Sequence, residues 1–201
     1  DVNVKAVDLV EAFSKRRYQQ RMLRYEMPIY MLTAQYFDAQ AVIYAGAFRR
    51  VTSALTEVDR GQKWLELFES AETSITARYA PRFAKLLQRI YYNSSIDAVN
   101  DYVLKLSFNL KNLRAVAFAK DRATELLREL NATTRLEIKE LIVQMLENGQ
   151  SYQSVAKAIR TRFNEYSNKV PSGKHIRNRA ELVSITESAN AYQQANVAMI
   201  R

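Results

Sequence analysis

Cysteine is absent from the 201-residue chain, and histidine occurs only once, at His175. The lack of cysteine excludes disulfides, thiolate zinc sites and cysteine nucleophiles, and it fits a reducing compartment. A single histidine cannot form a two-histidine metal face or a di-iron bundle, and a Ser-His-Asp triad would need His175 itself. These absences argue against the familiar enzyme classes. We therefore predict a protein that is not an enzyme, with no catalytic residue, no metal and no cofactor.

Glycine and proline are scarce, at 4 and 3 residues, whereas Ala, Leu, Arg, Glu and Gln are abundant. This composition favours long helices. No strand-like alternation persists along the chain, so we predict an all-α fold. No apolar run approaches the ~18 residues of a membrane span. The first residues, DVNVKAVDLVEAF, lack the basic start and apolar block of a signal peptide, and we expect none.

The apolar spacing predicts an elongated bundle of long helices over residues 1–130, followed by a compact three-helix module over residues 131–201. Pro28 is expected to break or kink its helix, and Pro81 is expected to kink a helix that continues beyond it. Further boundaries are expected at a turn over 59–62, a break over 91–95, a helix start near Leu113, a junction over 131–134, a helix end at Asn148-Gly149, a cap at Ser151 and a last helix from about Ile176.

The net charge is +9, which indicates an acidic partner such as nucleic acid or an acidic protein surface. Residues 157–179 carry seven basic residues and one acidic residue, a balance of 7 − 1 = +6. A second basic patch interleaves with tyrosines in the first helix. Solvated or snorkelling side chains remain an alternative interpretation of both patches. The candidate contacts are Lys15, Arg16, Arg17, Arg21, Arg24, Lys157, Arg160, Arg162, Lys169, Lys174 and Arg177.

The last 71 residues contain an ordered set of motifs, NATTRLEIKELIVQMLENGQSYQSVAKAIRTRF and then RAELVSITESANAYQQAN. This set resembles the phage head morphogenesis, or Mu F-like minor head, family. The resemblance matches Thr133, Thr134 and Arg135 to a helix start, Gly149 and Ser151 to a turn, and Thr186, Glu187, Ala191 and Asn196 to the last helix. The chain departs from the family pattern at Ile185, where the family has arginine, and Arg179 partly stands in for it. The aromatic-rich helices upstream resemble the family more weakly.

Thr186 and Glu187 are expected to point inward, and a buried carboxylate needs a cation. Arg135 is the predicted partner of Glu187, in an ion pair that would dock the last helix on the first helix of the module. The alternative makes Glu187 a general base beside Thr186 or Ser188, but no phosphate loop, metal set or nucleophile elbow accompanies it.

The resemblance implies a non-enzymatic virion protein that is assembled in the host cytoplasm and resides inside the phage head. Its implied partners are the portal or the inner capsid, in few copies, and its implied role is to assist packaging or ejection of DNA. The two basic patches make double-stranded DNA, bound without sequence specificity, a further candidate partner, and no membrane is expected. Family members usually continue beyond the last helix, so three interpretations of the end at Arg201 stay open: a truncation, a disordered tail or a shorter relative. The alternative is a cellular DNA-binding regulator that reads bases with Arg160, Arg162 and Asn164 on a helix-turn-helix-like unit over 133–164.

Overall fold

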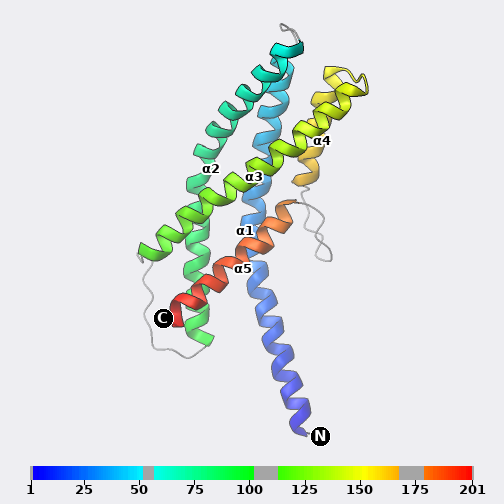
Figure 1. The fold of residues 1–201 in the computed structure, drawn as a ribbon. Helices are drawn as coiled ribbons and strands as arrows, with labels where there is room; N and C mark the ends of the chain where they lie inside the picture. The colour runs from blue at the N-terminus through cyan, green and yellow to red at the C-terminus, as the bar shows by residue number, and fades with distance from the viewer. Residues whose placement is uncertain (1, 52–56, 102–112, 168–178, 201) are drawn as a thin grey trace.

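The computed structural model describes residues 2–51, 57–101, 113–167 and 179–200. These residues form five α-helices and no strand, which confirms the predicted all-α class for the described part of the chain. The helices are α1 (Val2–Val51), α2 (Glu57–Asp101), α3 (Leu113–Glu147), α4 (Tyr152–Tyr166) and α5 (Arg179–Ile200). The chain is elongated, and the N-terminal part of α1 projects beyond the other helices (Figure 1).

Two long helices form the frame on which the others pack. α2 packs against α1, α3 packs on α2, α4 lies along α1, and α5 crosses both α1 and α2 (Figure 1). The core is rich in aromatic rings. The ring centroids of Phe37 in α1 and Tyr166 in α4 are 5.2 Å apart, and those of Tyr44 in α1 and Phe163 in α4 are 5.5 Å apart. These rings bury a large apolar area each, so the aromatic stripe of α1 is the surface that holds α4.

A helix break at Pro28 is wrong, because Pro28 lies inside the continuous helix α1, and Pro81 likewise lies inside α2. Proline removes one backbone hydrogen bond and costs about 3 kcal/mol in a helix interior. Tertiary packing offsets this cost, since Tyr25 and Ile29 beside Pro28 are buried, as are Tyr79 and Phe83 beside Pro81.

Three other predicted interruptions are also wrong. The turn over 59–62 and the break over 91–95 both lie within α2, and Ser94 and Ser95 of that break are buried. The junction over 131–134 lies inside α3, which runs unbroken past residue 130. The division of the chain into two units at residue 130 remains a prediction, but the helix α3 is not interrupted there.

The link between α3 and α4 follows the predicted turn chemistry. α3 begins at Leu113 and ends just before Asn148, as expected. Gly149 has a φ of 69°, a left-handed conformation that glycine adopts without a Cβ penalty. Ser151 is the N-cap of α4, and its hydroxyl accepts a hydrogen bond from the Ser154 amide at 3.2 Å. The predicted helix stop and cap are therefore confirmed. The start of the last helix near Ile176 lies outside the described residues, which resume at Arg179.

Candidate functional site

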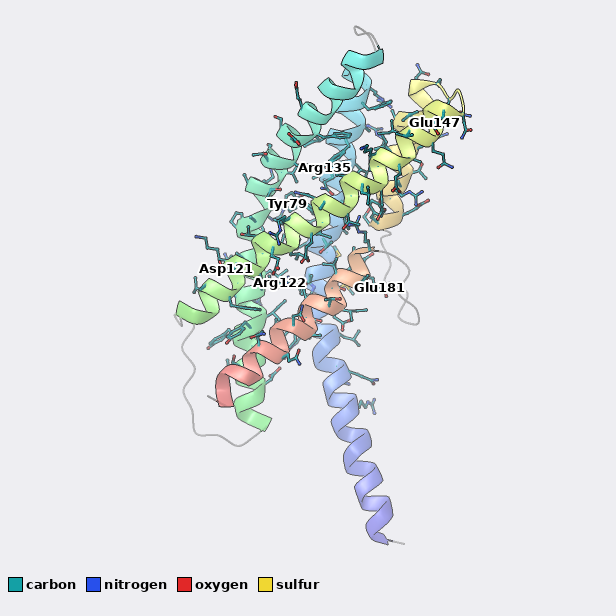
Figure 2. The ribbon with its side chains drawn as sticks, in the orientation of Figure 1. Tyr79, Asp121, Arg122, Arg135, Glu147 and Glu181 are labelled. Atoms are coloured by element: carbon teal, nitrogen blue, oxygen red, sulfur yellow. The ribbon has the colours of Figure 1, made fainter. Side chains whose placement is uncertain are left out.

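Polar side chains of α3 connect it to helices whose backbones do not approach it closely. Among the described residues, α3 packs closely on α2 and α4 but not on α1 or α5. Side chains span these intervals: Arg122, labelled in Figure 2, binds Glu187 of α5, and Asn131 is bound by Tyr36 and Gln40 of α1. The Asn131 carboxamide accepts hydrogen bonds from Tyr36 and Gln40 and donates one to Thr76 at 3.0 Å.

Glu187 of α5 is 2% exposed and is bound by two nitrogens of Arg122. The Nε–Oε2 distance is 2.8 Å and the Nη2–Oε1 distance is 2.6 Å. This two-pronged geometry is the strong form of an arginine–carboxylate contact. The hydrogen bonds to Glu187 raise the pKa of Arg122 above its usual range. Glu187 is therefore committed to holding α5 against α3, which argues against the general-base alternative.

The predicted Glu187–Arg135 pair is wrong, because Arg135 binds a different buried acid. Arg135 donates to both carboxylate oxygens of Glu72 on α2, with an Nε–Oε1 distance of 3.3 Å. Tyr44 of α1 donates to the same carboxylate, and burial raises the pKa of that tyrosine well above its usual range. Arg122 and Arg135 are 135 − 122 = 13 residues apart, or about 20 Å along a helix. One arginine therefore cannot replace the other.

Arg179, at the first residue of α5, contacts three other helices. Its guanidinium donates to the Thr134 hydroxyl at 3.0 Å and to the Leu130 carbonyl at 3.4 Å, both on α3. It also lies over the rings of Phe37 and Tyr166, with the guanidinium carbon 5.6 Å and 5.1 Å from the ring centroids. Such stacking adds to the attraction when the cation is partly desolvated.

The other motif residues divide between buried and exposed positions. Thr134 is buried, and its hydroxyl accepts a hydrogen bond from Arg179. Ser188 is also buried, and its hydroxyl donates a hydrogen bond to the Ile185 carbonyl. Thr186 is exposed, so its expected inward orientation is wrong. Gly149 and Ser151 form the turn before α4. The motif therefore acts mainly in helix packing.

One face of α4 is basic and carries no acid. Lys157 and Arg160 share this face with Gln153, Thr161 and Asn164, at steps of three, four and seven, and all are exposed. The opposite face, with Val155, Ile159 and Phe163, is buried. We call this exposed surface the α4 basic face.

The remaining candidate contacts have varied surroundings. Arg162 pairs with Glu165 at 3.4 Å and so stands apart from the α4 basic face. Arg16 is exposed, and Arg24 binds Asp97 of α2 at 2.8 Å. The side chains of Lys15, Arg17 and Arg21, and all of Lys169, Lys174, His175 and Arg177, lie outside the described part.

A third basic surface was missed in the sequence. Residues 73–96 of α2 contain four basic residues and no acidic one. Arg78, Arg82, Lys85 and Arg89 are all exposed and lie at steps of four, three and four, which places them on one helix face. We call this surface the α2 basic ridge. The absence of acidic residues over 73–96 was the signal that could have revealed this surface.

Within the described ranges, no three His, Asp or Glu side chains are grouped to hold a metal ion. In the same part of the chain, no helix has both the length and the apolarity needed to cross a bilayer. Comparisons with protein-family models, curated proteins and solved structures find no match. The functional argument therefore depends on the residues themselves.

Proposed function

We propose that this chain is a phage minor head protein, a non-catalytic component of virion assembly that acts at or near the portal and contacts packaged DNA. The proposal combines the motif resemblance of residues 131–201 with the charge of +9. The observation that carries it is the double hydrogen bond between Arg122 and Glu187. The most conspicuous acid of the motif serves packing, as an assembly scaffold requires.

DNA contact is supported by the α4 basic face. Lys157 and Arg160 have no hydrogen-bond or ion-pair partner among the described residues, and no acid lies on their face. Amide and hydroxyl groups beside them are typical of surfaces that hold phosphates without reading bases. Binding through such a surface is sequence-independent and depends strongly on salt.

The DNA contact is tested with a fluorescein-labelled duplex and fluorescence anisotropy. The affinity should fall by roughly one to two orders of magnitude between about 50 and about 200 mM salt, if three or four phosphates are contacted. The double reversal Lys157→Glu with Arg160→Glu should weaken binding at least tenfold. The matched control is Lys120→Glu with Lys139→Glu, which makes the same charge change at two exposed positions of α3. Equal losses in both variants, or an affinity that does not change with salt, would remove the DNA contact.

The portal association is tested separately by sedimentation. The chain is mixed with the assembled portal ring encoded beside its gene and run on a density gradient. Co-migration in a fixed, low ratio supports the assembly role. Migration of the chain alone would contradict it, and so would a gene that has no portal or terminase gene beside it.

A cellular DNA-binding regulator is the second candidate, and the α3–Gly149–α4 unit favours it. Two helices joined by a short turn, the second exposing Arg160 and Asn164, have the form of a base-reading unit. Discrimination between duplexes decides between the two functions. A preference of 1,000-fold or so for one sequence, the scale of specific sites, supports the regulator, and equal affinity for all sequences supports the virion protein.

A further inference from the structure

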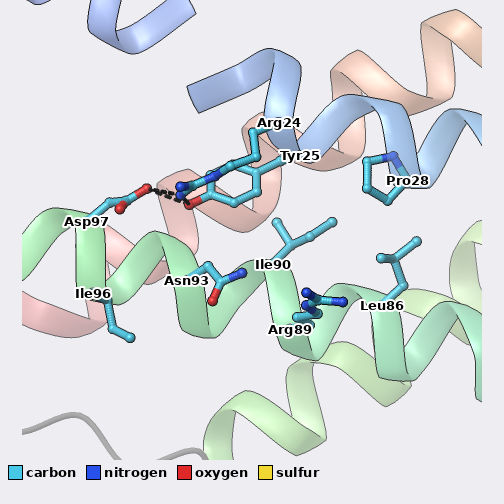
Figure 3. Close-up of a pocket in the computed structure, with 9 residues that line it drawn as sticks. All are labelled: Arg24, Tyr25, Pro28, Leu86, Arg89, Ile90, Asn93, Ile96 and Asp97. Carbon is cyan, nitrogen blue, oxygen red and sulfur yellow. Dashed lines mark hydrogen bonds and ion pairs between the residues drawn. The ribbon is translucent and has the colours of Figure 1, made fainter. Parts of the chain in front are cut away.

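A groove lies between α1 and α2, next to the α2 basic ridge. Its volume is about 440 Å³. Leu86, Ile90 and Ile96 of α2 and Pro28 of α1 give it an apolar lining (Figure 3). Asp97 closes one end, where it is held by Arg24 and Tyr25. Burial and the hydrogen bond to Asp97 raise the pKa of Tyr25 to about 12. The Tyr25 hydroxyl therefore keeps its proton at neutral pH and donates a hydrogen bond to Asp97.

Two polar side chains on the groove wall have no partner. Neither Arg89 nor Asn93 makes a hydrogen bond or ion pair within the described residues. Arg89 is exposed, and Lys85, Arg82 and Arg78 continue the same helix face away from the groove. The α2 basic ridge therefore approaches the groove through Arg89, whereas the rest of the α2 lining is apolar, apart from Asn93 and the Asp97 that closes one end.

Next to the groove-lining residues Arg24 and Pro28, α1 exposes a row of large apolar side chains. Leu23, Met27 and Met31 are 63%, 47% and 50% exposed, and they follow one another at steps of four residues. Met31 does not line the groove, but it follows the lining residue Pro28 by three positions and so lies beside Pro28 on the same face of α1. Flexible methionine side chains on a surface adapt well to apolar partners.

We propose that this surface binds an amphipathic helix of a partner protein, with carboxylates along one flank and apolar side chains along the other. The acidic flank lies on the α2 basic ridge, the apolar flank lies on Met27 and Met31, and side chains between them enter the groove. This is the helix-in-groove mode of recognition, and the charge asymmetry fixes the direction in which the acids face. The inference uses only this surface and stands apart from the proposed function.

Other occupants fit less well. Nucleic acid would match the ridge but would leave the apolar α1 rim without a complementary surface, since phosphates and sugars contact proteins mainly through charge and hydrogen bonds. A second copy would bring another chain of charge +9 against a cationic ridge. A small ligand of similar volume normally converges on buried polar groups, whereas Arg89 is exposed.

The test uses a labelled synthetic helix of about 20 residues, built from alanine with glutamates along one flank and leucines along the other. The comparison peptides are a scrambled version of the same composition and a version with lysine in place of glutamate. Binding to the full chain is measured by fluorescence anisotropy. The variants are Lys85→Glu with Arg89→Glu, Met27→Ser with Met31→Ser, and the matched control Lys120→Glu with Lys139→Glu. Circular dichroism of every variant verifies that the helices are retained.

The acidic amphipathic peptide should bind at least tenfold more tightly than either comparison peptide. The ridge reversal should weaken it at least tenfold, the methionine variant about threefold or more, and the control less than twofold. Absence of binding, equal binding of the scrambled peptide, or equal losses in ridge and control variants would overturn the proposal. So would displacement of the peptide by an equimolar duplex DNA, or a dimer in analytical ultracentrifugation that the ridge reversal dissociates.

Discussion

Two buried carboxylates are held by arginines of the same helix, and they differ in what else holds them. Glu187 of α5 and Glu72 of α2 are 2% and 5% exposed. Glu187 depends on Arg122, which two exposed acids of α3 also engage. Glu72 has Arg135 and, in addition, the hydroxyl of Tyr44. Arg135 is shared as well, with the exposed Glu69 at 3.6 Å. The described contacts of the two sites therefore differ in the neutral donor that Tyr44, from a third helix, supplies to Glu72.

This difference teaches how unequal two similar ion pairs are. Removing the cation from a buried pair leaves an uncompensated charge, and the remaining donors determine the cost. Glu72 keeps the Tyr44 hydroxyl when Arg135 is lost, whereas no other side chain is seen to donate to Glu187 among the described contacts. The α3–α5 contact should therefore be the more fragile of the two.

The largest expected effect separates the two arginines. Arg122→Ala should destabilise the chain by about 3–5 kcal/mol, the typical cost of an unpaired buried charge. Arg135→Ala should cost less, about 2 kcal/mol, because one charge-assisted hydrogen bond to Glu72 remains. Urea unfolding followed by circular dichroism measures both. A larger loss for Arg135→Ala would reverse the comparison.

A double-mutant cycle sharpens the assignment of partners. Arg122→Gln and Glu187→Gln should show a coupling of about 2 kcal/mol, because the two residues are in contact. Arg135→Gln and Glu187→Gln should be additive within about 0.5 kcal/mol, since those residues do not touch. The same unfolding measurement serves both cycles. Coupling in the second cycle would restore the pair that the motif alone suggested.

The smallest effect concerns pH and is confined to the Glu72 site. Burial and Glu72 raise the pKa of Tyr44 in the folded chain, so the unfolded chain loses this proton first, near pH 10. Stability is therefore fully present below pH 10 and decreases above it, by up to about 1.4 kcal/mol per pH unit for one group. Tyr44→Phe should lose less stability than the parent chain between pH 9 and about 11. Identical pH profiles would show that Tyr44 ionises normally.

Local features of the fold could be predicted from the sequence. The stop at Gly149 and the cap at Ser151 each depend on the chemistry of residues close in the sequence. The continuity through Pro28 and Pro81 could not, because it depends on core packing contributed by distant helices.

The candidate site was predictable in kind but not in its partners. A buried Glu187 requires a cation, yet its identity depends on how far α3 lies shifted along α5, which no local pattern encodes. Nothing in the sequence around Arg122 distinguishes it from the other charged residues of an amphipathic helix, so its pairing with Glu187 could not be predicted. Arg179 was placed in the motif, but its stacking on Phe37 and Tyr166 needed the three-dimensional arrangement.

The contacts of Arg179 have a consequence for how the molecule melts. One guanidinium joins the first turn of α5 to α1, α3 and α4, and α3 itself runs unbroken across residue 130. Separate melting of the two halves would have to rupture this junction and divide a continuous helix. Calorimetry should therefore record one cooperative transition, with the van't Hoff enthalpy equal to the total heat absorbed.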